Sequence, residues 1–270
     1  MQSSQPTQPT EESAVFVHTN PLENGFPQTL EGRFLFWLAV AFSTFQVLTA
    51  AHLVDMSSQI LRAVHVGFLM MLVFPLVAAS GDRPKVIKIL AWGLGIVGML
   101  VAAYQWIEYT PLLLRSGDPL PRDIVIGVIA LASIFLATWL TMGPALPIIA
   151  GLFLAYCLFG EYLPSPLNHR GYDFEQVIDH MAYGTEGIYG IPIFVSSSYI
   201  FLFILFGSFL EKAGMINLFT DVSLGLVGHK RGGPAKVSVI SSGLMGTISG
   251  SGVANVVTTG QFTIPLMKRF

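Results

Sequence analysis

The sequence predicts an all-α integral membrane protein with about six transmembrane helices, an interfacial helix and a re-entrant helical hairpin. Composition is the first observation behind this class. Hydrophobic residues make up 53% of the 270 residues and charged residues only 11%, whereas a soluble domain carries about 25% charged residues. The second observation is a series of apolar stretches of spanning length, and the third is a Gly- and Ser-rich break near the C-terminal end.

The N-terminal segment, residues 1–32, is polar and rich in Gln, Ser, Thr and Pro. We expect it to be disordered and cytoplasmic. It lacks the basic start, apolar core and small-residue cleavage site of a signal peptide. The first apolar stretch is therefore expected to remain in the membrane as an anchor.

Six stretches have the length and apolar character of membrane spans, for which about 20 residues are needed. They are 34–53, 60–80, 86–107, 123–142, 144–163 and 192–210. A single helix over 123–163 would be about 60 Å long at 1.5 Å per residue. Pro144 and Pro147 favour a turn and a fresh helix start, so two helices are predicted here, with one kinked helix as the alternative.

The orientation follows from basic residues in short loops, which prefer the cytoplasm. The segments 81–88 and 229–236 are both basic. With a cytoplasmic N-terminus both lie inside, and 108–122 and 161–191 lie outside. Within the outer segment, apolar residues at 174, 177, 178 and 181 have the spacing of an amphipathic helix, which we expect to lie in the membrane interface.

Several signals exclude other functions. Net charge is −2, which argues against nucleic-acid binding. Residues 93–98 read GLGIVG, but a dinucleotide fingerprint needs a strand before a helix. Here Ala91, Gly95, Gly98 and Ala102 form a small-residue stripe for helix packing instead. Scattered histidines lack metal-ligand spacing, and no paired carboxylates or Ser–His pair in the spans indicate an enzyme.

Charged and polar residues near span ends have ordinary explanations. Arg62 and His65 follow the start of the second span, where we expect their side chains to reach water. Glu108, beside Trp106 and Tyr109, is typical of an interfacial belt. Glu186 lies between glycines, and we expect a solvated loop carboxylate rather than a substrate or proton site.

The most informative segment is 237–266, VSVISSGLMGTISGSGVANVVTTGQFTIPL. One helix of this length would be about 45 Å long, and Ser249, Gly250, Ser251 and Gly252 break it in the middle. Basic residues flank both ends, so a hairpin that enters and leaves on the cytoplasmic side fits better than one crossing. Each arm, about 13 residues, is too short to span.

The polar residues at this break have the chemistry of a transport site. Broken helices provide free carbonyl groups for Na⁺ and free N–H groups for anions. Ser249, Ser251 and Asn255 add neutral oxygen ligands of the kind that a hard cation accepts, and Gly250 and Gly252 allow a sharp turn. A polar packing hairpin without a ligand is the alternative.

Four stretches carry a specific resemblance. They read YGTEGIYGIP at 183–192, FLFILFGSFLEKAG at 201–214, GHKRGGPAKVSVISSGLMGTISGSGVANVVTTG at 228–260 and FTIPLMKR at 262–269. Together they resemble the start of the large subunit of tripartite ATP-independent periplasmic (TRAP) permeases. The likeness is closest to fused small-plus-large permeases, often paired with TAXI-type binding proteins.

The resemblance implies a Na⁺-coupled permease in the bacterial inner membrane that imports organic acids such as dicarboxylates or amino acids. A periplasmic substrate-binding protein would deliver the solute. The hairpin residues Ser249, Gly250, Ser251, Gly252 and Asn255 would help form the ion and substrate sites, without any other cofactor.

It also implies a domain organisation. Residues 33–142 would be a four-span small-subunit-like domain, 143–164 a linking transmembrane helix, and 165–270 the start of the large permease domain. Such permeases contain a second hairpin, so this chain would be truncated or would pair with the remaining half of the permease. A membrane scaffold or assembly subunit without a solute site is the alternative function.

Overall fold

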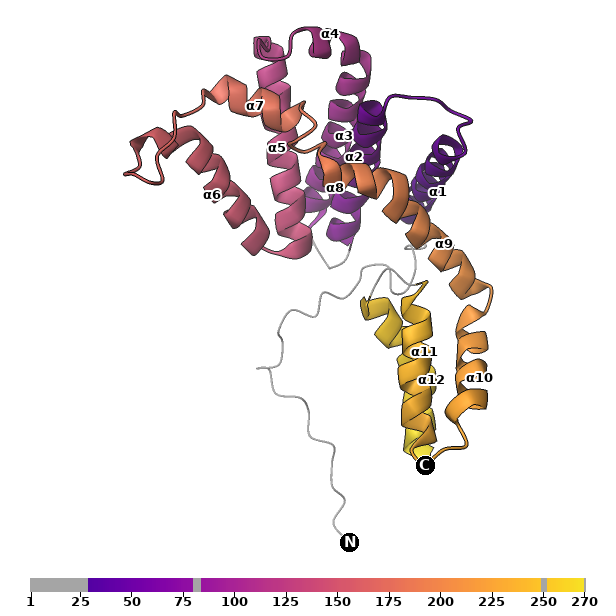
Figure 1. Cartoon of the computed structure of the whole chain (residues 1–270). Coiled ribbons are helices and arrows are strands. Elements are labelled where there is room, and N and C mark those ends of the chain that lie inside the picture. Colours follow the sequence, from indigo (N-terminus) through magenta and orange to yellow (C-terminus); the bar gives the residue numbers. More distant parts are fainter. Residues whose placement is uncertain (1–28, 80–83, 249–251, 270) are drawn as a thin grey trace.

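The structure is a computed structural model that describes residues 29–79, 84–248 and 252–269 (Figure 1). Every regular element in these ranges is helical. Within the described residues, six helical segments are long and apolar enough to cross a membrane. They are Leu30–Ala50, Ser58–Ala79, Lys85–Ile107, Pro121–Met142, Ala145–Tyr162 and Ile191–Lys212. The predicted all-α membrane class and its six spans are thereby confirmed.

The first helix, α1 (Leu30–Ala50), begins just before the end of the segment expected to be disordered. Thr29 is its N-cap, and the hydroxyl oxygen accepts a hydrogen bond from the backbone amide of Gly32. Residues 30–32 therefore belong to the helix, because a threonine at the N-cap satisfies one of the amides that a helix start leaves free. The rest of the predicted N-terminal segment, 1–28, lies outside the described residues.

The centre of the bundle is the close pair α2 (Ser58–Ala79) and α3 (Lys85–Ile107). The predicted small-residue stripe lies in this interface, with Ala91, Gly95, Gly98 and Ala102 all buried. A Cβ atom on Gly98 would lie 2.4 Å from the Cβ of Met70. The glycines therefore serve close helix packing, as predicted, rather than nucleotide binding.

A short helix, α4 (Tyr109–Leu114), follows α3 and leads to α5 (Pro121–Met142). Helix α5 ends at Gly143, whose φ of 83° favours glycine. The chain then begins α6 (Ala145–Phe159), which ends in the 3₁₀ turn η2 (Gly160–Tyr162). The two-helix prediction for 123–163 is confirmed. Figure 1 shows that α6 diverges from the bundle after the turn at Gly143.

The amphipathic segment forms α7 (Phe174–Ala182), as its spacing predicts. Its apolar face packs on α5 within the protein. Val177, Ile178 and Ala182 are buried, and a Cβ on Gly127 of α5 would lie 2.6 Å from the Cγ2 of Ile178. The chain then passes through 183–190 into a continuous helical span made of α8 (Ile191–Val195), the π-helical turn η3 (Ser196–Ile200) and α9 (Phe201–Lys212).

The last three helices form a separate layer beyond the end of α9 (Figure 1). They are α10 (Met215–Val227), α11 (Gly233–Gly246) and α12 (Gly252–Arg269). Helix α11 has 14 residues, close to the expected arm length, whereas α12 has 18. The C-terminal arm is thus longer than predicted.

Candidate functional site

The predicted break in the segment 237–266 separates two neighbouring antiparallel helices. Met267 near the end of α12 lines the same cavity as Gly233 at the start of α11, and the hydroxyl of Ser238 donates to that of Thr263 at 3.4 Å. Of the predicted site residues, Gly252 and Asn255 lie in α12. Ser249, Gly250 and Ser251 lie outside the described residues.

Asn255 holds the first turn of α12 against α11. Its Nδ2 donates a hydrogen bond of 3.0 Å to the backbone carbonyl of Ser242. A Cβ on Gly246 would lie 3.5 Å from the same nitrogen, so the small residue leaves room for the amide. Gly252 begins the helix in open space, with no atom within 4 Å of a Cβ built there.

A polar seam continues from Asn255 along α12. Thr259 donates to the carbonyl of Asn255 at 2.6 Å, and Thr263 to the carbonyl of Thr259 at 2.8 Å. Both threonines are buried. Sequence reasoning did not single them out, although positions 255, 259 and 263 have the four-residue spacing of one helical face.

Helix α10 covers the other side of α11 with a second polar contact. The hydroxyls of Thr220 and Ser241 lie 3.4 Å apart. Ser241 and Ser223 are buried together with the apolar Val237 and Met245. Hydroxyl groups therefore lie in both interfaces of α11, with α10 on one side and with α12 on the other.

The end of α11 contacts the last spanning helix. A Cβ on Gly207 of α9 would lie 2.5 Å from the carbonyl oxygen of Ile248. Only glycine accommodates this approach without a shift of backbone. The residues next to the break are therefore held against a membrane span.

The chemistry available in the hairpin is that of neutral oxygen. No three His, Cys, Asp or Glu side chains come together as a metal site in the part of the chain that the structure describes. Serine, threonine and asparagine oxygens suit a hard monovalent cation. They do not suit acid–base catalysis, which needs a titratable group.

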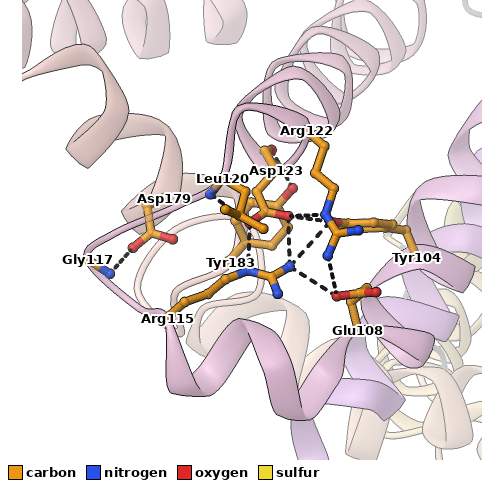
Figure 2. Close-up of polar contacts among 9 residues, drawn as sticks. All are labelled: Tyr104, Glu108, Arg115, Gly117, Leu120, Arg122, Asp123, Asp179 and Tyr183. Carbon is orange, nitrogen blue, oxygen red and sulfur yellow. Dashed lines mark hydrogen bonds and ion pairs between the residues drawn. The ribbon is translucent and has the colours of Figure 1, made fainter.

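A charged cluster lies at one end of the bundle, where α3, α4, α5 and α7 meet (Figure 2). Its centre is Asp123, whose side chain is 0% exposed. Arg115 binds both carboxylate oxygens, with Nε to Oδ2 at 2.7 Å and Nη2 to Oδ1 at 2.9 Å. The backbone amide of Leu120 and the hydroxyl of Tyr104 also donate to Asp123. The carboxylate is therefore fully paired, as a buried charge must be.

The same cluster includes the carboxylate predicted to lie in an interfacial belt. Glu108 accepts from Nη2 of Arg115 at 3.1 Å and from Nη2 of Arg122 at 3.0 Å. The hydrogen bond to Asp123 is the main cause of a raised pKa for Arg115. The guanidinium of Arg115 therefore stays charged and joins the carboxylates of Asp123 and Glu108.

Side chains of the bundle reach the segment that follows α7 at several points. Gln59 of α2 donates to the carbonyl of Tyr183 at 2.6 Å, and Gln105 of α3 to that of Ala182 at 2.9 Å. Arg62 donates to the carbonyl of Tyr189 at 2.6 Å and lies over the ring of Phe194. These bonds satisfy backbone acceptors that the helix end and the irregular segment leave free.

A buried histidine links three helices and corrects one expectation. His65 is 1% exposed rather than in contact with water. One ring nitrogen contacts the amide nitrogen of Gln46 in α1, and the other lies 3.1 Å from the hydroxyl of Ser196 in η3. The expectation failed because Ser196, 131 residues away, provides a polar partner inside the bundle. Glu186, in contrast, is 78% exposed, as expected of a loop carboxylate.

These features define a class: a polytopic membrane protein in which a span-rich bundle precedes a broken polar hairpin of the kind found in secondary transporters. Residues 128–270 match the family described as "Tripartite ATP-independent periplasmic transporter, DctM component". The chain belongs to this family, whose members are transporters and not enzymes. They work with a periplasmic binding protein and a small permease subunit.

Two curated relatives support the assignment. The chain is 38% identical over 66 residues to a protein of Haemophilus influenzae described as a TRAP transporter large permease protein. It is 33% identical over 66 residues to the 2,3-diketo-L-gulonate TRAP transporter large permease protein of Escherichia coli. Each alignment covers 24% of this chain and 16% of the relative. No solved structure matches the chain significantly.

Proposed function

We propose that this chain is a permease component of a Na⁺-coupled, binding-protein-dependent TRAP transporter that imports organic acids such as dicarboxylates or amino acids. The observation that carries the proposal is the broken hairpin α11–α12, in which Asn255, Thr259 and Thr263 line a polar seam. Polar residues at a helix break are costly inside a membrane unless they line a site or bind one another.

The coupling ion would bind at the break, on Asn255 and the residues 249–252. Support comes from the neutral oxygen chemistry of the seam and from the helix start at Gly252. A helix that begins at membrane depth presents free N–H groups to an anion, while the preceding chain offers carbonyl oxygens to a cation. One break can therefore serve both the acid and its Na⁺.

The substrate class has separate support. The Escherichia coli relative is named for 2,3-diketo-L-gulonate, a sugar acid that carries a carboxylate. An organic acid would present the same anionic group to the start of α12.

The domain organisation is proposed as a fused permease of the TAXI-associated type in the bacterial inner membrane, with a cytoplasmic N-terminus. Residues 33–142 would act as the small-subunit-like domain, 143–164 as the linking helix and 165–270 as the start of the large domain. The contacts of Gln59, Arg62 and Gln105 with residues 182–189 support a fixed attachment between the two parts. The proposed partner is a periplasmic binding protein.

Uptake measurements test the proposal. The permease is reconstituted into liposomes with its binding protein, and uptake of a labelled acid is followed with an inward Na⁺ gradient. Asn255→Ala should weaken Na⁺-driven uptake about tenfold, as expected when one ligand or its positioning bond of about 1.4 kcal/mol is lost. Ser251→Ala should act in the same direction.

Ser208→Ala is the matched control, because Ser208 is exposed on α9 and its hydroxyl bonds only to the carbonyl of Ile204 in the same helix. This variant should transport like the unaltered protein. If Asn255→Ala and Ser251→Ala both leave the Na⁺ dependence unchanged, the coupling site lies elsewhere.

A scaffold without a solute site is the second candidate. The hydrogen bonds from Gln59, Arg62 and Gln105 to backbone carbonyls of residues 182–189 favour this function. Such bonds hold two parts of a protein in a fixed position, as a scaffold requires. A scaffold predicts that Arg62→Ala lowers the amount of assembled transporter while Asn255→Ala has no effect on transport. The transporter hypothesis predicts that Asn255→Ala impairs uptake at an unchanged amount of assembled protein.

A further inference from the structure

A cavity at one end of the bundle is separate from the hairpin. It has a volume of about 240 Å³ and lies among the start of α2, the end of α3, the short helix α4 and the C-terminal end of α7. Gln59, Gln105 and Asp179 are among the residues that line it. The proposed transport site uses none of them.

The two glutamines have a defined orientation. Each side-chain nitrogen donates to a backbone carbonyl, Gln59 to Tyr183 and Gln105 to Ala182. A carbonyl only accepts hydrogen bonds, so the nitrogen of each amide must face it and the side-chain oxygen takes the other position. Gln105 is only 4% exposed, and the hydrogen bond of its side chain runs from its nitrogen to the carbonyl of Ala182. Because Gln105 lines the cavity, its side-chain oxygen can accept a hydrogen bond from a donor that enters there.

The cavity is also electrically negative. Asp179 contributes a carboxylate, of which Oδ2 accepts from the backbone amide of Gly117 at 2.9 Å. The C-terminal end of α7 adds the negative end of a helix dipole. The nearby Arg115 is already bound to Asp123 and Glu108. His180 also lines the cavity, and its Nε2 lies 3.4 Å from the carboxylate of Glu186. The cavity therefore offers acceptors and negative charge to a cation that carries N–H donors.

The surroundings place this cavity beside lipid headgroups. Leu112 and Leu113 of α4 form part of its wall. Close by, Leu114 is 85% exposed and Trp106 is 52% exposed at the end of the spanning helix α3. An exposed tryptophan at the end of a span is typical of the membrane interface, where a phospholipid headgroup lies.

We propose that this cavity binds the primary ammonium group of an aminophospholipid, phosphatidylethanolamine being the probe of choice. The ammonium group would donate to Gln105 Oε1 and Gln59 Oε1 and pair with the Asp179 carboxylate. The lipid would thereby stabilise the junction between the four-span bundle and the segment after α7. This inference does not depend on the transport site.

Native mass spectrometry of the purified chain with short-chain lipids tests the proposal without any substitution. Dioctanoyl phosphatidylethanolamine, its N-methyl and N,N-dimethyl derivatives, phosphatidylcholine and phosphatidylglycerol are compared. Retention should fall stepwise as methyl groups replace N–H donors, because the headgroup keeps its charge while it loses hydrogen bonds. Equal retention of phosphatidylethanolamine and phosphatidylcholine, or a preference for phosphatidylglycerol, would overturn the proposal.

Asp179→Asn is the corresponding variant. Asparagine keeps an oxygen for the amide of Gly117 but removes the charge, so affinity for phosphatidylethanolamine should fall on the order of tenfold. Asp118→Asn is the matched control, since Asp118 is an exposed carboxylate at the same end of the bundle and does not line the cavity. Melting temperatures in lipid-free detergent show whether both variants fold.

Free ethanolamine distinguishes the source of the ammonium group. If the lipid is the ligand, millimolar ethanolamine should displace little phosphatidylethanolamine, because it lacks the contacts of the acyl chains with the apolar wall. Displacement at equal concentrations would overturn the lipid as the source. An unchanged lipid preference in Asp179→Asn would remove the cavity as the binding site.

Discussion

The side-chain amide of Asn255 donates a 3.0 Å hydrogen bond to the backbone carbonyl of Ser242, across the break between α11 and α12. This bond joins the start of one helix to the final turns of the other. Any motion of the break relative to α11 must therefore strain or release it. The residue predicted to bind an ion is thus also one that sets the geometry of the hairpin.

The hairpin makes a prediction about sidedness. The single cysteine of the sequence, Cys157, is first replaced by alanine, and Lys230→Cys and Lys268→Cys are then introduced separately. Both should react with an impermeant maleimide only from the cytoplasmic side, because a re-entrant hairpin returns to the side it entered. Asp118→Cys should react only from outside. Labelling of 230 and 268 from opposite sides would show that the segment crosses the membrane once.

The charged cluster makes a prediction about stability. Asp123→Asn should lower the free energy of unfolding by about 3 kcal/mol, because it leaves the partly buried Arg115 without its principal carboxylate. Thermal unfolding in detergent measures the loss. Asp118→Asn, which changes an exposed carboxylate in the adjoining turn, should have little effect. A loss below about 0.5 kcal/mol, the size of a surface pair, would mean that water replaces the carboxylate in the cluster.

The α2–α3 interface makes a prediction about packing. Gly98→Ala places a methyl group 2.4 Å from the Cβ of Met70, and the overpacking should cost about 1–3 kcal/mol. Gly93→Ala on the same helix meets no atom within 4 Å. It should be neutral or slightly stabilising because alanine favours a helix. Equal melting temperatures for the two variants would contradict the role of the small-residue stripe.

The contact between Arg62 and Tyr189 makes a prediction about local motion. Arg62→Ala removes the charged donor that binds the Tyr189 carbonyl. The segment 183–190 should then unfold locally more often. A lost bond of about 1.5 kcal/mol corresponds to roughly tenfold faster amide hydrogen exchange there. Arg170→Ala, which removes an exposed cation over the ring of Tyr172, is the control and should leave 183–190 unchanged.

The phenol of Tyr183 makes a prediction about pH. It donates to the backbone carbonyl of Asp123 at 2.6 Å, and burial raises its pKa above the ordinary value of about 10. A raised pKa means that the neutral phenol stabilises the fold below about pH 10, and that this stability is lost as the pH rises through the folded-state pKa.

Tyr183→Phe is the variant that isolates this contribution. At pH 7 it should unfold about 1 kcal/mol more easily than the unaltered protein. The difference should shrink above about pH 10, where the unfolded tyrosine ionises. A difference that stays constant from pH 7 to 11 would show that the hydroxyl contributes no pH-dependent stability.

Local signals predicted much of the fold because the bilayer imposes a local rule. The two-helix reading of 123–163 followed from length and from Pro144, and Gly143 makes the turn. The stripe through Gly95 and Gly98 followed from helical spacing. The hairpin helices followed from the glycine-rich break, although Thr259 and Thr263 show that its polar seam extends further than predicted.

The long-range polar contacts could not be predicted in the same way. His65 was expected to reach water because only its distance from a span end was visible, and its partner Ser196 comes from another span. Asp123 and Tyr183 lie 60 residues apart, and no periodicity relates them.

Sequence by itself thus determined the membrane class, the six spans, the break near residue 250 and the family resemblance, since each depends on neighbouring residues and on the thickness of the hydrocarbon layer. Tertiary structure alone decided which polar side chains are buried and what they bind. The physical reason is that a polar group enters an apolar interior only where a partner satisfies it, and those partners are brought together by folding.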